Sequence, residues 1–435
     1  MDQHRLDQLQ TRVRGQVHLP TDPGFDRARQ PWNRAIEQQP LAVVDAADAD
    51  DVVEVVRFAG RHRIPVTTQA SGHGATGHNN DAILLRTAAL DTITVDPDTR
   101  TARIGAGVRS GDLQRAVAPH GLTALPGSSP VVTVTGAGLG GGLSWFSRSF
   151  GWMSDSIRGL DVVTADGEAR HVSADSDAEL FWALRGGGGN LAIVTAVELG
   201  LHRAPTVVGG RQLWHGRHAR AVARAFREMT STAPDGLTLW FELLQFPGAE
   251  PMVAIDSTYL GDEATARGLM SATDQLPAPM ADSRAVLSVA ELGTITAEPT
   301  DPGPGQSRAE LLTQLDDAAL DALLDEPLDP VLLVQIRHLG GALARPSDSP
   351  QGPLTAPYLM YAFGSPSSPE QADAIAQKQS RLAQALPVTG RKPLTFLNPA
   401  EDLSAALPSA SRRRLREIKA ARDPQQLIQG NFGLD

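Results

Sequence analysis

The segment that decides the fold runs Ser71-Gly72-His73-Gly74-Ala75-Thr76-Gly77-His78 and lies between two short apolar segments, at residues 64–68 and 82–85. Its glycines have the G-x-G-x-x-G spacing of a Rossmann dinucleotide site, in which a helix must begin at the motif to hold the pyrophosphate. Here a predicted strand follows, so we exclude a Rossmann fold. A loop of small residues can still bind a pyrophosphate through converging backbone N–H groups. The alternative is a tight turn between two strands.

Two more glycine-rich segments follow, at residues 127–142 and 185–190. Glycine lets the backbone approach a flat ligand because no Cβ stands in the way. Each segment alone is a weak signal. Three such segments separated by short strands are hard to explain as turns only, and they predict a ligand-binding cradle in the first half of the chain.

The rest of the chain predicts a mixed α+β fold. In the first half, hydrophobic patterning predicts strands at residues 41–44, 64–68, 82–85, 92–95, 101–104, 160–164 and 193–201, and helices after Asp48 and at 110–120 and 178–184. Composition changes after Pro205, where strands at 237–244, 253–259 and 330–336 alternate with helices at 219–229, 262–273 and 308–324. This order favours an antiparallel sheet covered by helices. Further helices are expected at 368–386 and 408–421, and an irregular tail from 423 to 435.

Composition excludes several classes of protein. The 435 residues carry a net charge of −11, with 41% hydrophobic and 20% charged residues, which is typical of a globular enzyme and not of a nucleic-acid-binding surface. There is no cysteine. Disulfides, thiolate metal sites and a thioether-linked cofactor are therefore excluded, and we expect no metal. No stretch of about 18 apolar residues predicts a membrane helix, and the polar N-terminus shows no signal peptide, so a cytoplasmic location is expected.

The order of motifs along nearly the whole chain resembles a known family. The chain is similar to flavin-linked oxidases of the vanillyl-alcohol-oxidase superfamily, with its PCMH-type FAD-binding fold, and in particular to the compact bacterial berberine-bridge-enzyme-like oxidases. The matching segments are residues 51–58 with 65–66, 72–73, 104–107 with 111–113, 127–142, 150–151, 155–156, 162–167, 180–186, 188–190, 337–343, 396–398 and 419–431. The resemblance implies a two-domain architecture: an FAD-binding domain of residues 1–205, completed by 400–435, and a substrate domain of 206–399.

His73 is the residue to which the resemblance gives the most specific role. It occupies the family position whose imidazole bonds the 8α carbon of the isoalloxazine, so FAD linked covalently through His73 alone is expected. Many relatives add a cysteinyl link where this chain has Ser129, and here that second link is impossible. The loop departs from the family in having Gln69 where arginine is common. His78 is an alternative tether.

The resemblance also implies the other cofactor contacts. The pyrophosphate loop would contain Gln69, Ala70, Ser71, Gly72 and Gly74, with Gly77 and His78 beside it. The ribityl chain and ring would be lined by Ser128, Ser129, Thr133, Gly138 and Gly142. Backbone of Ile193 and Val194 would hold the adenine side, and Asn431 with Phe432 would close over the cofactor from the tail.

The resemblance identifies the catalytic base less specifically. Relatives use a Tyr, Glu, Asp or Lys of the substrate sheet, and the candidates here are Tyr361, Tyr358, Arg337 and Asn398, with Glu242 and His338 as further ones. Two tyrosines three apart on one strand cannot face the same side, so at most one of Tyr358 and Tyr361 lines the site. Each candidate can equally be an ordinary core or sheet residue.

Three functions stay open at this stage. The first is an oxidase that takes a hydride from an alcohol or amine carbon of a small metabolite, with dioxygen as final acceptor and hydrogen peroxide as product. The second is oxidative cyclisation in natural-product biosynthesis. The third is a flavoprotein scaffold whose pocket catalyses a non-redox cyclisation or only binds a ligand. Neither a nucleic acid nor a membrane is an expected partner.

Overall fold

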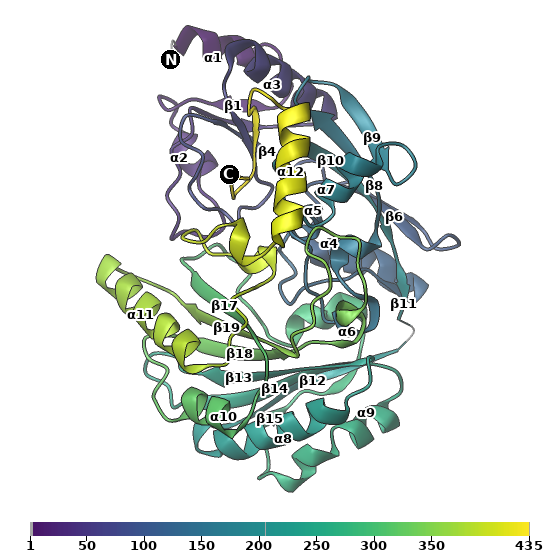
Figure 1. Cartoon of the computed structure of the whole chain (residues 1–435), viewed down its shortest axis with the longest axis vertical. Helices are drawn as coiled ribbons and strands as arrows, with labels where there is room; N and C mark the ends of the chain where they lie inside the picture. Colours follow the sequence, from purple (N-terminus) through teal and green to yellow (C-terminus); the bar gives the residue numbers. More distant parts are fainter. Residues whose placement is uncertain (1–2, 205, 435) are drawn as a thin grey trace.

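The structure, a computed structural model, describes residues 3–204 and 206–434. Pro205, at which the sequence predicts a change of domain, lies outside these residues. The fold is mixed α+β, as predicted. Figure 1 shows two stacked parts: an upper part built from the N-terminal half and the C-terminal tail, and a lower part built around one large sheet.

The first sheet of the upper part has the strand order β1-β2-β4-β3-β20. Its central pairs β2–β4, β4–β3 and β3–β20 are parallel, and β1 pairs antiparallel with β2. The bounds are β1 (Gln16–His18), β2 (Ala42–Asp45), β3 (Val66–Thr68), β4 (Ile83–Arg86) and β20 (Ile428–Gln429), with helices α1 (Gln3–Gln10), α2 (Phe25–Ala28) and α3 (Ala49–His62). Asp48 caps α3 by accepting from the backbone N–H of Asp51, as the sequence predicts.

The second sheet of the upper part is antiparallel, in the order β5-β6-β10-β8-β9. Its bounds are β5 (Ile93–Asp96), β6 (Thr101–Gly105), β8 (Ile157–Thr164), β9 (Ala169–Ser173) and β10 (Ala192–Gly200); β7 (Leu122–Thr123) pairs separately with β11 (His202–Arg203). The accompanying helices are α4 (Ser110–Val117), α5 (Val134–Leu139), α6 (Ser147–Phe150), α7 (Ala178–Leu184) and α12 (Ser409–Arg422). The C-terminal helix α12 lies beside α7 although they are far apart in sequence (Figure 1).

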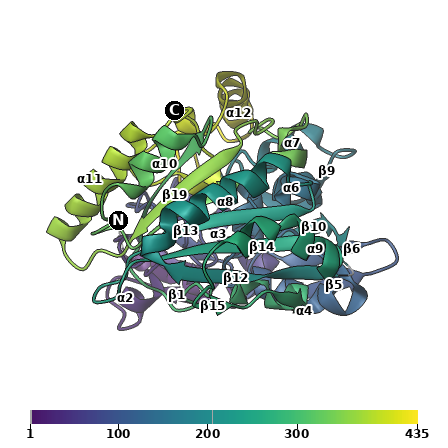
Figure 2. The same ribbon diagram turned by 90° about the horizontal axis from the view of Figure 1, so that it is seen from below.

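The lower part is an eight-stranded sheet whose main path runs β15-β12-β14-β13-β18-β19-β17, with β16 pairing β12. Its bounds are β12 (Val207–His215), β13 (Leu237–Leu244), β14 (Met252–Leu260), β15 (Ala281–Asp282), β16 (Ala285–Leu287), β17 (Gln306–Leu312), β18 (Leu333–His338) and β19 (Tyr358–Gly364). Helices α8 (Ala219–Thr232), α9 (Glu263–Leu269), α10 (Asp317–Leu324) and α11 (Pro369–Ala385) cover its outer face, as Figure 2 shows from below.

Short 3-10 helices connect these elements: η1 (Ala118–His120), η2 (Met153–Ser156), η3 (Gly216–His218), η4 (Ser271–Gln275), η5 (Val289–Thr294), η6 (Gly341–Ala344), η7 (Leu394–Phe396) and η8 (Leu403–Ala405). Within the described residues, no helix combines the length and the apolar character that crossing a membrane requires.

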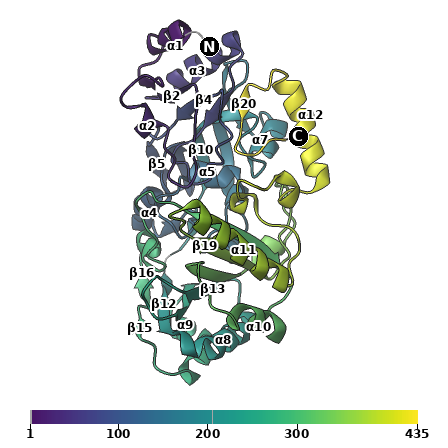
Figure 3. The same cartoon turned by 90° about the vertical axis from the view of Figure 1, so that its left-hand side faces the viewer.

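Strand alternation gives the large sheet two different faces. Leu239, Phe241 and Leu243 of β13 belong to the apolar core under the helices. Trp240 and Glu242 alternate with them and therefore point the other way, toward the upper part. Figure 3 shows the sheet between α8, α9 and α10 on one side and the upper part on the other. The inner face of the sheet, which carries Trp240 and Glu242, is thus turned toward the upper part of the molecule.

Two sequence-based expectations are wrong in this region. Residues 308–324 were expected to be one helix, but β17 occupies Gln306–Leu312 and pairs antiparallel with β19, and α10 begins only at Asp317. The segment is rich in helix-forming residues, yet helix propensity is a weak prior that tertiary pairing overrides. The tail was expected to be irregular, but β20 adds a parallel strand to β3. Strand β12, with its Gly209-Gly210 pair, was not predicted at all.

Candidate functional site

The loop 69–74 joins two neighbouring parallel strands, β3 and β4. No helix follows the loop, as predicted, and the chain returns directly to β4. Gly72 has φ +82°, and a Cβ there would lie 2.8 Å from Cβ of Pro31. Only glycine fits this position without strain. The N-terminal segment that contains Pro31 therefore packs directly on the loop.

A cavity of about 340 Å³ lies over this loop; we call it the glycine cavity. Its walls come from all three glycine-rich segments and from the tail. The lining residues are 68–74, 87, 106, 132–133, 135–137, 139–140, 188–190, 192–194, 394–395, 397, 403 and 429–432. Its volume falls within the range of small-molecule sites, about 300–1,000 Å³.

The walls of the glycine cavity fit a flat ligand that carries phosphates. At Gly189 no atom lies within 4 Å of where a Cβ would be, so the backbone itself is the wall. The Thr135 hydroxyl is buried, lines the cavity and has no hydrogen-bond partner among the described residues. Backbone without Cβ atoms and unpaired donors are what a bound dinucleotide requires. The residues present therefore fit FAD.

The structure brings eleven of the predicted cofactor residues together around the glycine cavity. They are Gln69, Ala70, Ser71, Gly72, His73, Gly74, Thr133, Ile193, Val194, Asn431 and Phe432. Gly77, His78, Ser128, Ser129, Gly138 and Gly142 are not among the lining residues. Gly142, for example, has φ +72° and packs against Met153, whose Cβ would lie 2.8 Å from an added Cβ.

The C-terminal tail forms one wall through polar contacts that the sequence did not reveal. Asn190 accepts from the backbone N–H of Gly430 at 2.9 Å and donates to the carbonyl of Phe432 at 2.9 Å. Asn431 donates to the carbonyl of Gly74 at 2.7 Å. These contacts join the third glycine segment, the tail and the loop 69–74 into one enclosure.

The buried Lys419 of α12 fastens the same tail. Its ammonium group donates to the carbonyls of Asn190, at 2.7 Å, and Ile428, and it pairs with the carboxylate of Asp423 at 2.5 Å. A lysine within an otherwise solvated basic helix gives no sequence signal of such a role. The spacing of four positions from Lys419 to Asp423 is the one hint.

His73 stands at the end of the glycine cavity. Its Nδ1 lies 2.8 Å from the Ser71 hydroxyl, its Nε2 is buried without a partner among the described residues, and its ring stacks on Trp32 with centroids 4.3 Å apart. Burial, assisted by the positive charge of Arg109, lowers the pKa of His73 from 6.5 to about 4. The ring is therefore neutral at physiological pH, and one nitrogen carries a free lone pair.

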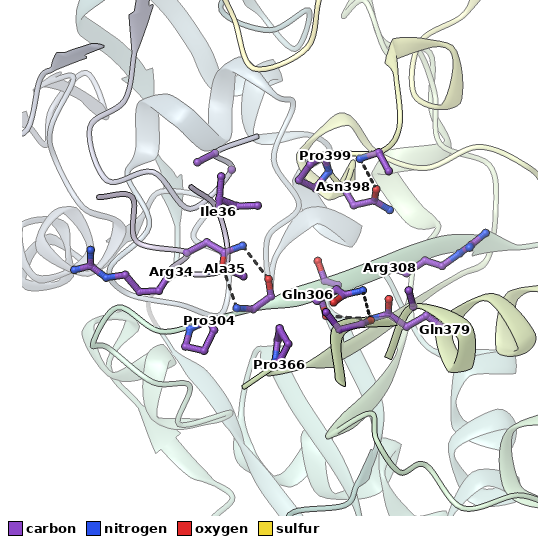
Figure 4. Close-up of a pocket in the computed structure, with 18 of the residues that line it drawn as sticks. Arg34, Ala35, Ile36, Pro304, Gln306, Arg308, Pro366, Gln379, Asn398 and Pro399 are labelled. Carbon is purple, nitrogen blue, oxygen red and sulfur yellow. Dashed lines mark hydrogen bonds between the residues drawn. The ribbon is translucent and has the colours of Figure 1, made fainter. Parts of the chain in front are cut away.

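A second cavity, of about 700 Å³, adjoins the first at His73; we call it the sheet-edge cavity. It lies between the N-terminal segment, the edge strand β17 with α11, and the segment 397–400. Figure 4 shows Arg34, Ala35 and Ile36 on one side of it, and Gln306 with Gln379 on another. His73, Gly74 and Leu397 line both cavities. Asn398, one of the predicted catalytic residues, lines the larger one.

The two tyrosines of β19 face opposite sides, as strand alternation predicts. Tyr358 lies under the helices, where its hydroxyl is 2.8 Å from that of Thr230. Tyr361 lies on the inner face and meets Phe396 edge-on, with centroids 5.8 Å apart. Burial raises the pKa of Tyr361. Tyr358 is therefore turned away from both cavities.

Arg337 shares the inner face with Tyr361. Its guanidinium lies 3.9 Å from the ring centroid of Trp240 and 5.5 Å from that of Tyr361, and it donates twice to the side-chain oxygen of Gln335, at 3.0 and 2.7 Å. Burial lowers the pKa of Arg337. Neither Arg337 nor Tyr361 is among the residues that line the two cavities.

A buried ionic cluster, only part of which the sequence suggested, continues from Arg337 across the sheet. Gln335 donates to Glu242, and Arg211 donates to Glu242 at 2.6 Å and to both oxygens of Asp256 at 2.6 and 2.7 Å. Glu242 and Asp256 are fully buried, at 1% and 0% exposure. Burial and the neighbouring Asp256 raise the pKa of Glu242. Arg211 and Asp256 lie on neighbouring strands, and strand pairing, which the sequence does not give, brings them together.

Comparison with known proteins agrees with this geometry. The family model described as an FAD binding domain matches residues 40–173. Among curated proteins, the (R)-6-hydroxynicotine oxidase of Paenarthrobacter nicotinovorans is 36% identical over 195 residues, which cover 44% of this chain and 43% of that protein. An FAD-linked oxidoreductase of Bacillus subtilis is 29% identical over 239 residues, 54% of this chain and 53% of that protein. The matches thus span about half the length of these curated relatives.

Several solved structures match nearly the whole chain. The 6-hydroxy-D-nicotine oxidase of Arthrobacter nicotinovorans has a TM-score of 0.84 and 25% identity, over 97% of this chain and 98% of that one. The berberine-bridge-like protein 1 of Physcomitrella patens has a TM-score of 0.88 and 20% identity, over 99% of both. The chain therefore contains an FAD binding domain and has the fold of these FAD-linked oxidases. The resemblance and the PCMH-type fold predicted from the sequence are both confirmed.

The matched FAD binding domain overlaps the glycine cavity. The matched residues 40–173 contribute the loop 69–74 and the second glycine segment to its walls. Because the chain has no cysteine, any covalent link to the flavin must use a histidine. Among residues 3–204 and 206–434, no group of three or more His, Asp or Glu side chains converges as a metal ion would require.

Proposed function

We propose that this chain is an FAD-dependent oxidoreductase that removes a hydride from an alcohol or amine carbon of a small metabolite, with dioxygen as final acceptor and hydrogen peroxide as product. One observation carries the proposal: the glycine cavity and the sheet-edge cavity meet at His73, Gly74 and Leu397. A small molecule in the larger cavity would therefore adjoin a flavin held in the smaller one. The bound flavin would accept the hydride and pass two electrons to dioxygen.

The protein's own part in the reaction is to hold, orient and deprotonate. We propose that the cofactor contacts are the eleven predicted residues that line the glycine cavity, with His73 as the single tether. Asn398 lines the sheet-edge cavity and is placed to hydrogen-bond a substrate hydroxyl or amine. Tyr361, on the inner face of the sheet, is the candidate for taking the substrate proton. Arg337 lies 5.5 Å from its ring and, as a protonated guanidinium, can only donate hydrogen bonds, and Tyr358 is bonded to Thr230 under the helices.

Covalent attachment would use the neutral imidazole of His73 as nucleophile. One ring nitrogen would bond the methyl carbon at position 8 of a bound isoalloxazine. The methyl carbon and the imidazole nitrogen would each give up one hydrogen, and dioxygen would take up both with two electrons as hydrogen peroxide. The Ser71 hydroxyl, 2.8 Å from Nδ1, can donate to or accept from the ring in either tautomer.

The substrate class stays broad. Relatives with similar folds include proteins named for oxidation of 6-hydroxynicotine and of chitooligosaccharides. A secondary-metabolite intermediate handled in the cytoplasm is our proposal for this chain, and we propose the same division into an FAD domain (1–205 with 400–435) and a substrate domain (206–399) that the sequence suggested.

The visible spectrum of the purified protein before and after acid precipitation tests the cofactor proposal. We expect a yellow protein whose colour stays with the pellet, and a His73→Ala variant whose flavin is released by acid. Colourless protein would refute the flavin site. Acid-stable flavin in His73→Ala would refute the tether. Peroxide release and anaerobic bleaching with a panel of alcohols and amines test the oxidase activity.

A further inference from the structure

Trp32 is the aromatic side chain in contact with the ring of His73. The two rings are stacked, with centroids 4.3 Å apart and planes 17° from parallel. The backbone N–H of Trp32 also donates to the carbonyl of Ser71 at 2.9 Å, in the loop that carries His73. Trp32 is therefore fixed to the loop by its main chain and covers one face of the imidazole with its side chain.

The segment that carries Trp32 is anchored from behind by a buried arginine. Arg86 of β4 donates to the carbonyls of Ala28, at 3.0 Å, and Gln30, at 2.7 Å. Arg86 is 7% exposed, and burial lowers its pKa to about 10. A guanidinium kept out of water to bind two carbonyls of one segment fixes the position of that segment.

A chain of amides fastens the same segment to the loop at a second point. Gln38 donates to the carbonyl of Arg29 at 2.7 Å, and its side-chain oxygen accepts from Gln69 at 2.6 Å and from Asn79 at 2.8 Å. Gln69 stands where the family more often has arginine. In this chain the residue serves to hold the N-terminal segment against the loop.

The other side of Trp32 is tied to the lower part of the molecule. Asn33 exchanges two hydrogen bonds with the backbone of Gly305, both at 2.9 Å, and the N–H of Arg34 donates to the carbonyl of Gly303 at 3.0 Å. Figure 4 shows residues 34–36 facing Pro304 and Gln306. Trp32 thus lies where the FAD loop, the N-terminal segment and the sheet-edge cavity meet, and it is held from both sides.

We infer that Trp32 is a positioning residue for covalent attachment of the flavin: its indole holds the plane of the His73 imidazole in the orientation in which a ring nitrogen can bond the cofactor. This inference rests on the proposed covalent link through His73. A histidine ring turns about a broad torsion when nothing packs on it. Attack at carbon needs both distance and direction, and misplacement by about 1 Å can cost about 100-fold in rate.

The test compares Trp32→Leu, which removes the flat ring, with Trp32→Phe, which keeps one on His73. Trp182→Leu is the matched control, because Trp182 on α7 packs under Arg414 and lies outside both cavities. Each protein is purified with its bound flavin and then incubated with added FAD. The readout is the acid-stable share of the total bound flavin over time, which does not depend on how much protein folds.

We expect attachment in Trp32→Leu to be about ten-fold to one hundred-fold slower than in the wild type. The attachment rate in Trp32→Phe should stay within about three-fold of the wild-type rate, because phenylalanine keeps a flat ring with a smaller stacking area. The rate in Trp182→Leu should match the wild type. Total flavin should stay bound without the link in Trp32→Leu. This ratio separates positioning from a merely structural role, which would lower bound and linked flavin together.

Several outcomes would overturn the inference. Equal rates in Trp32→Leu and the wild type would show that the stack does not matter, and equally slow rates in Leu and Phe would show that a flat ring is not the cause. A Trp32→Leu protein with no flavin of either kind would assign the residue to the fold. If the wild type itself has bound but acid-labile flavin, the covalent proposal fails first, and the inference fails with it.

Discussion

The contacts by which Lys419 fastens the tail beside the glycine cavity should be measurable as local stability of the tail. The perturbation is Lys419→Met, which keeps an unbranched side chain and removes the charge. Lys419 and Asp423 are 4% and 1% exposed, and the ammonium also binds the carbonyls of Asn190 and Ile428. Without Lys419 the Asp423 carboxylate stays buried with two backbone N–H donors, those of Leu427 and Ile428.

Removing one partner of a buried ion pair typically costs about 3–5 kcal/mol. The retained backbone donors to Asp423 place the expected cost toward the lower end, about 3 kcal/mol. At about 1.4 kcal/mol per factor of ten, the tail should open about one hundred-fold more often. Because β20 is only two residues long, the opening should release the wall of the glycine cavity formed by residues 429–432.

Hydrogen exchange of peptides that cover residues 424–434 measures this opening directly. Arg413→Met is the matched control, since it makes the same charge change at an exposed position of the same helix. We expect faster exchange in Lys419→Met and wild-type exchange in Arg413→Met. Adding Asp423→Asn to Lys419→Met should restore part of the protection, because the uncompensated charge is then gone. Unchanged exchange in Lys419→Met would refute the conclusion that Lys419 fastens the tail.

Three further predictions follow from buried groups and open glycines. Burial and the charge of Arg148 lower the pKa of His338 from 6.5 to about 3. Between these pH values only the unfolded chain binds the proton, so the free energy of unfolding should fall as pH drops from 6.5 toward 3. In His338→Gln, urea unfolding should show a smaller fall in that free energy over the same pH range. Tyr361→Phe should lower kcat at least ten-fold, because it removes the hydroxyl proposed to take part in proton transfer. Tyr358→Phe should leave kcat unchanged. It should lower the free energy of unfolding in urea by about 1 kcal/mol, because the hydrogen bond to Thr230 is lost. In Gly189→Ala no protein atom lies within 4 Å of the added Cβ, so the variant should fold normally, but the methyl group would occupy space proposed for the flavin. Bound flavin, measured by absorbance at 450 nm, should be on the order of ten-fold below that of the wild type. The control Gly268→Ala, on exposed α9, should keep its bound flavin.

Local sequence signals were sufficient for the elements whose packing agrees with their propensity. Helix α3 begins after the capping Asp48, and α7 occupies the predicted residues 178–184, because each combines a capping carboxylate with an apolar stripe. The prediction for strand β17 was wrong because its packing disagrees with its propensity. Its residues favour a helix in isolation. The strand is stabilised by seven residue pairs with β19, which lies about fifty positions further along the chain. Long-range pairing of this kind leaves no local periodicity to read.

The candidate site divides in the same way. Loop residues 69–74 could be predicted because the glycines that admit a ligand are adjacent in sequence. Trp32, Asn190 and Lys419 could not, since each acts through contacts with segments far away. Strand alternation did predict that Tyr358 and Tyr361 diverge. It could not say which one faces inward, because that depends on the register of β19 against β18.

The two ends of the chain close on the His73 loop from opposite sides. The N-terminal segment reaches it through Pro31 and Trp32, and the tail reaches it through Asn431, which bonds Gly74, and the carbonyl of Asn431 accepts from Thr76 at 3.0 Å. Neither end belongs to the glycine motif. The motif therefore lines the cavity, but the ring that stacks on the imidazole and the contacts that close the cavity come from residues outside it. Substitutions at these residues of the two ends should consequently affect flavin binding as directly as substitutions in the loop, although they lie outside the glycine pattern of residues 71–78.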